Sequence, residues 1–117
     1  MIVLICGSRD WNNKNLILQE LKNFTGITKV IHGACRGADI LAGQAAKELS
    51  LLVEEFPADW DRYGLSAGPK RNQQMLDEGK PDYVMAFHND INKSKGTRDM
   101  INRAIKAGIK YKIIRNI

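Results

Sequence analysis

The chain has 117 residues, 44% of them hydrophobic and 26% charged. This is the composition of a single globular domain over residues 1–117, and it excludes a disordered chain. The formal net charge of +5 favours an anionic partner, and the excess lies in the second half, where residues 61–117 carry twelve basic and six acidic side chains.

Strand-like and helix-like segments alternate along the chain. The apolar run 2–6 predicts a buried strand, and the apolar spacing that follows predicts a helix between the candidate caps Asn12 or Asn13 and Gly26. The same reasoning predicts further strands at 29–32, 51–56, 82–87 and 111–114, helices at 38–49 and 72–78, and a helix marked by Met100, Ile101, Ala104 and Ile105 that ends at Gly108.

Five strands that alternate with four helices predict one fold class. Parallel neighbours need crossover connections, so we expect an α/β fold: a Rossmann-like, doubly wound domain of about five parallel strands with helices on both faces. Such sheets bind ligands beyond the carboxyl ends of their strands. The loops that lead from a strand into a helix are therefore the places to look for a site.

Each of these loops carries polar residues, glycines or both. They are residues 7–11, 32–39, 57–60 and 95–99. A helix N-terminus attracts anions, and glycine lets the backbone approach a phosphate closely. We therefore expect ligand contacts from Gly7, Ser8, Arg9, Gly33, Arg36, Gly37, Asp39, Gly96 and Thr97.

A structural alternative accompanies several of these candidates. The glycines also serve simply to turn the chain, Asp39 also suits a helix start, and Thr97 also suits a helix cap. The spacing Gly33-x-x-x-Gly37 differs from the dinucleotide and triphosphate fingerprints, so a standard NAD or ATP site is not indicated.

The irregular stretch 59–72 adds a second group of candidates. Trp60 and Tyr63 suit stacking on a base, or packing back on the core. Arg71 and Asn72 suit contact with a phosphate or ribose, or exposure to solvent.

Neither a metal nor a membrane is indicated. The two histidines and two cysteines lack metal-ligand spacing, so we expect no metal and no cofactor. Two cysteines also suit a reducing environment, which predicts a cytoplasmic location. No apolar run approaches the length that spans a bilayer.

Four ordered motifs resemble one family. They are GSRDW at 7–11, HGACRGAD at 32–39, AGPKRNQQM at 67–75 and GTRD at 96–99. Together they are similar to the YspA-like branch of the SLOG superfamily, which includes the DNA-processing protein DprA and the LOG enzymes. The resemblance implies a Rossmann-like domain that binds a nucleotide or a nucleotide-derived ligand, often as a sensor, with members common in phage genomes and a homo-oligomer as the assembly. It assigns a ligand loop to Gly7, Ser8 and Arg9, a glycine-rich turn to Gly33, Gly37 and Asp39, an arginine element to Arg71, and phosphate binding to Gly96 and Thr97.

One departure from this resemblance concerns catalysis. LOG enzymes hydrolyse an N-glycosidic bond with a glutamate, and that position is Met100 here. Asp99 lies one residue earlier, rotated by about 100° on a helix. LOG-type hydrolysis is therefore not expected.

Three functions remain open from the sequence. The first is binding of an ADP-ribose-like or ribose-phosphate ligand, as a sensor or a sponge of a nucleotide signal. The second is a nucleotide-processing hydrolase that uses Asp39, Asp59 or Asp99 on a glycosidic or phosphate bond. The third is single-stranded nucleic-acid binding like that of DprA, with Trp60 and Tyr63 as stacking residues.

Overall fold

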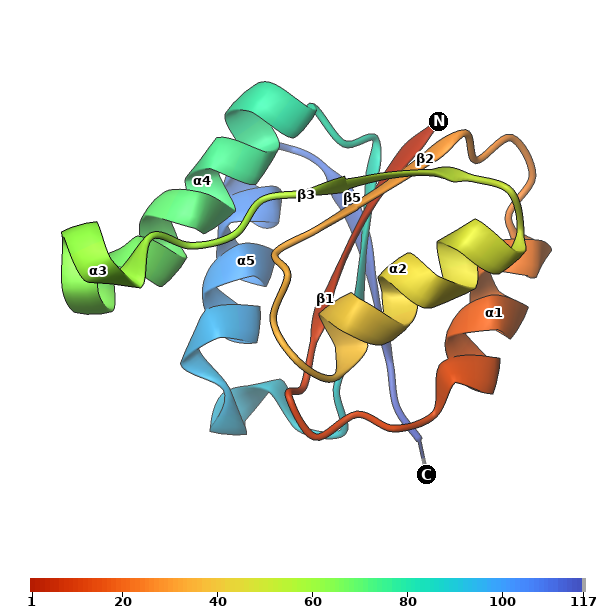
Figure 1. Cartoon of the computed structure of the whole chain (residues 1–117), viewed down its shortest axis with the longest axis horizontal. Coiled ribbons are helices and arrows are strands. Elements are labelled where there is room, and N and C mark those ends of the chain that lie inside the picture. Colours follow the sequence, from red (N-terminus) through yellow and green to blue (C-terminus); the bar gives the residue numbers. More distant parts are fainter. Residues whose placement is uncertain (117) are drawn as a thin grey trace.

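The computed structural model describes residues 1–116 and shows a five-stranded parallel sheet between two layers of helices (Figure 1). This confirms the predicted Rossmann-like α/β fold. The strands are β1 (Ile2–Gly7), β2 (Lys29–His32), β3 (Leu52–Glu55), β4 (Tyr83–Phe87) and β5 (Lys110–Ile114). The helices are α1 (Lys14–Asn23), α2 (Ala38–Glu48), α3 (Trp60–Tyr63), α4 (Ala67–Gly79) and α5 (Lys95–Lys106), with 3₁₀ turns η1 (Gly64–Ser66) and η2 (Ile91–Lys93).

The strand order is β3-β2-β1-β4-β5, with β1 in the centre. Val3 pairs with Val30 of β2 on one side and with Tyr83 of β4 on the other. The chain therefore builds β1, β2 and β3 in one direction and then returns to place β4 beside β1. This change of direction makes the carboxyl ends of β1 and β4 the switch point, where sheets of this class bind their ligands.

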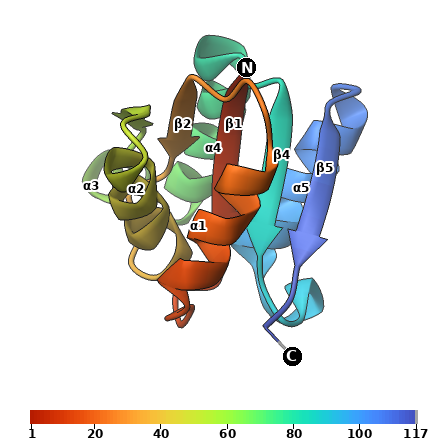
Figure 2. The same ribbon diagram turned by 90° about the vertical axis from the view of Figure 1, so that its right-hand side faces the viewer.

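Successive residues of β1 supply the two cores. Val3 and Ile5 pack with α1 and α2, whereas Leu4 packs with α4 and α5, because neighbouring side chains of a strand point to opposite faces. Figure 2 shows α1 and α2 in front of the sheet and α4 and α5 behind it. Ile17 of α1 and Met100 of α5 are fully buried on these two faces, and each side chain contributes about 1.5–3 kcal/mol of transfer free energy.

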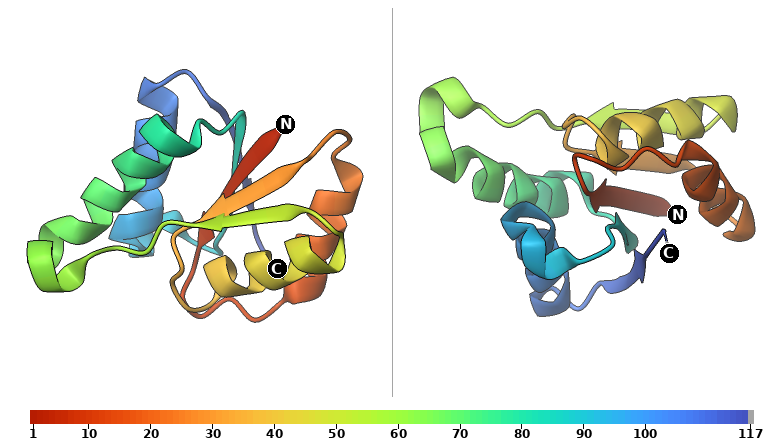
Figure 3. Two further views of the ribbon diagram at one scale, coloured as in Figure 1. Left: turned by 45° about the horizontal axis from the view of Figure 1, so that its top comes forward. Right: turned by 90° about the horizontal axis from the view of Figure 1, so that it is seen from below.

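The expected irregular stretch is more ordered than the sequence indicated. It contains α3 and η1, and α4 begins at Ala67 instead of residue 72. Asp59 caps α3 by accepting a hydrogen bond from the backbone N–H of Arg62. Pro69 stands in the first turn of α4, where a missing N–H breaks no helical hydrogen bond. Figure 3 shows α3 standing out beyond the body of the sheet.

The structure shows which residues cap α1 and α5, two helices whose caps the sequence left open. Asn13 caps α1, since its side chain accepts from the N–H of Leu16. Ser94, not Thr97, caps α5 by accepting from the N–H of Thr97 at 3.2 Å. Thr97 therefore lies inside the first turn of α5, and its hydroxyl accepts from that of Ser94 at 3.1 Å.

Within residues 1–116, the structure contains no helix that is both long enough and apolar enough to cross a membrane.

Candidate functional site

A cleft of about 370 Å³ opens beyond the carboxyl ends of β1 and β4. It lies at the switch point and is bordered by the start of α2, the start of α4 and the start of α5. Its lining consists of Cys6, Gly7, Ser8, Arg9, Asp10, Cys35, Arg36, Asp39, Arg71, Asn72, Met75, His88, Lys93, Ser94, Lys95, Gly96 and Thr97.

The cleft gathers most of the candidate ligand residues. The predicted residues that line it are Gly7, Ser8, Arg9, Arg36, Asp39, Arg71, Asn72, Gly96 and Thr97. Three predicted ligand residues lie outside the lining: Gly33, Gly37 and Trp60. Trp60 lies on α3, where its side chain covers Gly68, and Tyr63 lies on the same helix with Lys70 above its ring. The two aromatic side chains are therefore outside the cleft lining.

Gly33 and Gly37 shape the cleft from behind its surface. Gly37 has a φ of +79°, and a Cβ there would meet the carbonyl groups of Ser8 and Arg9. The N–H of the next residue, Ala38, donates to the Ser8 carbonyl at 3.0 Å. A Cβ at Gly33 would meet the guanidinium of Arg71. Gly37 needs glycine because two loops of the site approach each other closely there, whereas Gly33 leaves room for the Arg71 side chain of α4.

Asp39 is a buried carboxylate at the start of α2. Its side chain is 6% exposed, and Oδ2 accepts hydrogen bonds from the N–H groups of Gly33 and Cys35, both at 3.2 Å. Burial raises its pKa from 3.8 to about 6, although these two hydrogen bonds and the charges of Arg71 and Arg9 act in the opposite direction. Asp39 therefore fixes the loop between β2 and α2 and retains a proton more readily than an ordinary carboxyl group.

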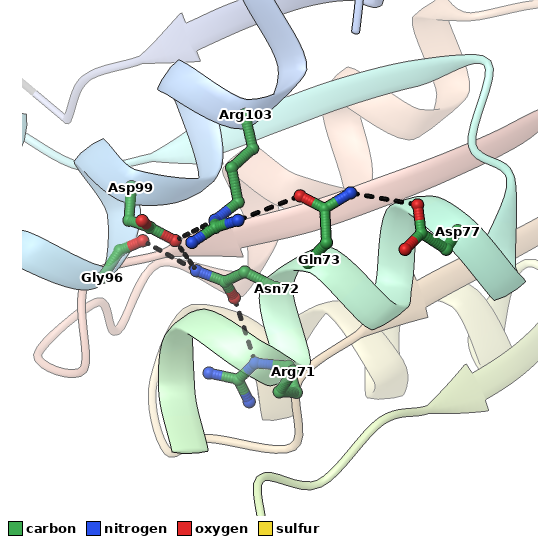
Figure 4. A network of polar contacts seen from close by, with 7 residues as sticks. All are labelled: Arg71, Asn72, Gln73, Asp77, Gly96, Asp99 and Arg103. Atoms are coloured by element: carbon green, nitrogen blue, oxygen red, sulfur yellow. Dashed lines mark hydrogen bonds and ion pairs between the residues drawn. The ribbon is translucent and has the colours of Figure 1, made fainter. Parts of the chain in front are cut away.

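Arg71 and Asn72 begin a polar network that joins α4 to α5 (Figure 4). Arg71 Nη1 donates to the Gly33 carbonyl at 2.6 Å, and Nε donates to Asn72 Oδ1 at 3.0 Å. Asn72, which is 4% exposed, donates through Nδ2 to Asp99 Oδ2 at 2.9 Å and to the Gly96 carbonyl at 3.3 Å. The network fixes the position of the Arg71 guanidinium in the cleft wall.

The network continues along α4 and α5 and includes Asp99, one of the three carboxylates considered for catalysis. Arg103 donates through Nε to Asp99 Oδ2 at 2.8 Å and through Nη1 to Gln73 Oε1 at 2.9 Å. Figure 4 shows Asp99 facing Asn72 and Arg103. Asp99 is therefore a structural acceptor between helices and lies outside the cleft lining.

The other carboxylate candidates are placed differently. Asp59 caps α3 and lies outside the cleft lining, whereas Asp39 lines it. Met100, at the position of the LOG glutamate, is fully buried in the core beneath α5. Asp39 is the one catalytic candidate of the three that the structure brings to the cleft.

The charge of the lining is strongly positive. Arg9, Arg36, Arg71, Lys93 and Lys95 line the cleft together with Asp10 and Asp39 as its acidic residues. The first turn of α5 adds the amides of a helix N-terminus, and Gly96 has no heavy atom within 4 Å of where a Cβ would stand. This combination attracts a multiply charged anion such as a phosphate group.

Sequence reasoning missed several lining residues. Cys6 is the last residue but one of β1, and His88 directly follows β4, both next to the switch point. Met75 comes from helix α4 and Cys35 from the loop before α2. His88 accepts a hydrogen bond from the Asp90 N–H through Nδ1, and partial burial lowers its pKa, so the ring is neutral near pH 7. The sequence position of His88, directly after a predicted strand, could have marked it as a site residue. Cys6 gave no such signal, because only the strand order places β1 in the centre of the sheet.

A metal site is not found in the described part of the chain. Residues 1–116 contain no group of three or more His, Cys, Asp or Glu side chains that could hold a metal ion.

Three comparisons place this chain among known proteins. The family model "YspA, cpYpsA-related SLOG family" matches residues 1–63. The chain is 35% identical over 116 residues to "Gene 61 protein" of Mycobacterium phage D29, a match that covers 92% of this chain and 90% of the phage protein.

Among solved structures, the fold is similar to that of the UDP-GlcNAc 2-epimerase from Neisseria meningitidis, whose structure was determined with UDP-GlcNAc bound. The TM-score is 0.58 at 17% identity, and the match covers 97% of this chain and 31% of the epimerase chain. At this identity the similarity concerns the fold alone. The family model, in contrast, matches more than half of the sequence, and this chain belongs to the YspA, cpYpsA-related SLOG family.

Proposed function

We propose that the cleft binds a nucleotide or a nucleotide-derived ligand, with an ADP-ribose-like or ribose-phosphate compound as the best fit, and that the protein acts as a sensor or a sponge of such a signal. One observation carries the proposal: five basic side chains and the N-terminus of α5 converge on a single cleft at the switch point of the sheet. Family membership supports a nucleotide-related ligand.

The residues divide into two roles in this proposal. The N-terminus of α5 at Lys95 and Gly96 binds a phosphate together with the Thr97 hydroxyl, since the Thr97 N–H already donates to Ser94 Oγ, and Lys93 and Lys95 add positive charge. Ser8 and Arg9 line the cleft from the loop after β1. Arg71 is already oriented by Gly33 and Asn72, so little side-chain entropy is lost when it contacts a ligand.

The test uses the intact protein and a ligand panel. Isothermal titration with AMP, ADP, ADP-ribose and UDP-GlcNAc measures affinity, and the last compound is included because the epimerase of similar fold was solved with it. Lys95→Glu reverses one charge in the cleft and is expected to weaken binding by about 10- to 150-fold, because a hydrogen bond to a charged group contributes about 1.5–3 kcal/mol.

The control for this variant is Lys106→Glu. Lys106 carries the same charge on the same helix, is exposed at the other end of α5 and does not line the cleft. Its affinity is expected to match that of the unmodified protein. Absence of binding to every member of the panel, or equal weakening by both variants, contradicts the proposal.

A hydrolase is the second candidate, and Asp39 is the observation in its favour. It is a carboxyl group in the cleft with a pKa raised to about 6, close to the value at which general acid or base catalysis is efficient. Incubation with each nucleotide, followed by chromatography, separates the candidates. An intact ligand supports binding alone, whereas release of a base or phosphate that is lost in Asp39→Asn supports the hydrolase.

The cytoplasmic location and the homo-oligomer stay predictions. Sedimentation velocity of the purified protein tests the second of them, and a single species at the monomer mass contradicts it.

A further inference from the structure

A second, smaller cavity adjoins the cleft. Its volume is about 140 Å³, and it is lined by Ser8, Asp10, Trp11, Asn12, His88, Asn89 and Asn116. Ser8, Asp10 and His88 also line the cleft, so the two cavities share a wall. We refer to this smaller cavity as the side pocket. Its residues come from the loop after β1, the end of β4 and the segment after β5.

The side pocket differs from the cleft in charge. The cleft has five basic side chains, whereas the residues that line the side pocket include none, and Asp10 supplies a carboxylate. A phosphate group is therefore favoured in the cleft and disfavoured in the side pocket. The side pocket therefore suits a group without negative charge, next to an anionic group in the cleft.

The polar atoms of the side pocket include both hydrogen-bond donors and acceptors. Asn89 Oδ1 accepts from the Asn116 N–H at 2.7 Å, and Asn116 Oδ1 accepts from Asn13 Nδ2 at 3.1 Å. Within residues 1–116 the Nδ2 groups of these two asparagines have no partner, so each remains a donor. His88 uses Nδ1 as an acceptor, which leaves Nε2–H as its donor.

Further acceptors come from the loop after β1, the strand next to β4. Asp10 has a largely exposed carboxylate and Asn12 an exposed amide oxygen on the loop after β1. A sugar hydroxyl both donates and accepts, so it matches a lining that offers amide donors together with carboxylate and amide acceptors. Trp11, which is 6% exposed, contributes an apolar ring surface to the same lining.

The walls are held in place without a ligand. Arg115 Nε donates to the Asn89 carbonyl at 2.9 Å, and the His88 N–H donates to the Ile114 carbonyl at 3.0 Å. Trp11 Nε1 donates to the Asn13 carbonyl at 2.9 Å. A cavity fixed in this way binds with little loss of conformational entropy.

We propose that the side pocket binds the sugar ring of a nucleoside diphosphate sugar while the diphosphate lies in the cleft. This inference rests on the proposed function, because it assigns the phosphates to the cleft, and it narrows the ligand to a compound with an uncharged sugar beyond the phosphates. The sugar-binding residues are Asp10, Asn12, His88, Asn89 and Asn116.

The experiment compares each diphosphate with its sugar-bearing form. Affinities for ADP and ADP-ribose, and for UDP and UDP-glucose, are measured at one salt concentration, and the ratio within each pair is the readout. Asn89→Asp keeps the Oδ1 that accepts from Asn116 and removes the Nδ2 donor. Asn12→Ala removes an exposed side chain, so its fold is expected to be intact, which thermal melting verifies.

Both variants are expected to lower the preference for the sugar-bearing form about tenfold, the equivalent of one or two hydrogen bonds. Asn92→Ala is the matched control, since Asn92 is an exposed asparagine of η2 that lines neither cavity. Its ratio is expected to stay unchanged.

Three outcomes overturn the inference. If the unmodified protein binds ADP-ribose and UDP-glucose no better than ADP and UDP, the side pocket does not hold a sugar, and the proposed function stands. If the variants weaken ADP and ADP-ribose equally, the side pocket holds the base instead. If neither AMP nor any diphosphate binds, the proposed function fails and the inference fails with it.

Discussion

Replacement of Asp39 by asparagine tests the electrostatics of the cleft. The pKa of Asp39 is raised from 3.8 to about 6, so between these values the folded protein retains a proton that the unfolded chain releases. The stability associated with the protonated form is fully present below pH 3.8 and is lost as the pH rises through about 6. Burial of the charged carboxylate therefore costs stability at neutral pH.

The size of this cost follows from the shift. A difference of about 2.2 pKa units at about 1.36 kcal/mol each amounts to about 3 kcal/mol. Asparagine is similar in shape to the protonated acid, and its Oδ1 can accept the same two hydrogen bonds from Gly33 and Cys35. Asp39→Asn is therefore expected to be as stable as the unmodified protein near pH 4 and about 3 kcal/mol more stable near pH 7.

Urea unfolding at pH 4.5, 5.5, 6.5 and 7.5 measures the difference between the two proteins. Taking the difference removes the contributions of His32 and His88, whose pKa values are lowered by burial and which affect stability over a similar pH range. Glu78→Gln, which removes one carboxyl group from an exposed site on α4 outside the cleft, is the matched control.

One result refutes this reasoning. If the unmodified protein is the more stable of the two at pH 7, then the backbone hydrogen bonds and the charges of Arg71 and Arg9 outweigh the burial of the carboxylate. A carboxylate that destabilises the fold at neutral pH, in contrast, is the kind of residue that a binding or catalytic role retains.

The remaining predictions concern packing and reactivity. Gly37→Ala should lower the free energy of unfolding by about 3 kcal/mol, because the new Cβ combines a positive φ with contacts to the Ser8 and Arg9 carbonyls. Gly108→Ala is the control: its φ is +73° but the space around it is open, so the expected loss is about 1 kcal/mol. Equal losses in urea titration would contradict the close approach of the two loops at Gly37. Asn72→Ala should cost about 1–3 kcal/mol, because it removes the side-chain donor to the Gly96 carbonyl and one of the two donors to Asp99 Oδ2, whereas Gln74→Ala on the exposed side of α4 should have little effect. A similar loss in both argues against the network. Burial raises the pKa of the Cys6 thiol, so in an Ellman assay at pH 8 the Cys35→Ser protein should react more slowly than Cys6→Ser, and equal rates would show that Cys6 is accessible as a thiolate.

Much of this molecule is determined by local sequence. Several features act over only a few residues: the apolar run at β1, the helical spacing of Ile17 and Leu21, and the caps at Asn13 and Asp59. The alternation of strands and helices can therefore be predicted without a structure. Alternation in turn predicts a parallel sheet, whose carboxyl edge is where the polar loops lie. The motifs around Gly7, Gly37 and Gly96 were found for this reason.

The composition of the site depended on the tertiary structure. Strand order is a long-range property: β1 pairs with β4 through Val3 and Tyr83, which are eighty positions apart in the sequence, and no local pattern encodes that choice. The pairing sets the switch point, brings Cys6 and His88 into the cleft lining and leaves Trp60 on a helix outside it. It also turns Asp99 toward Asn72 and Arg103 between two helices, because the side of α5 that packs on α4 is fixed by burial of Met100 and not by the chemistry of its neighbour.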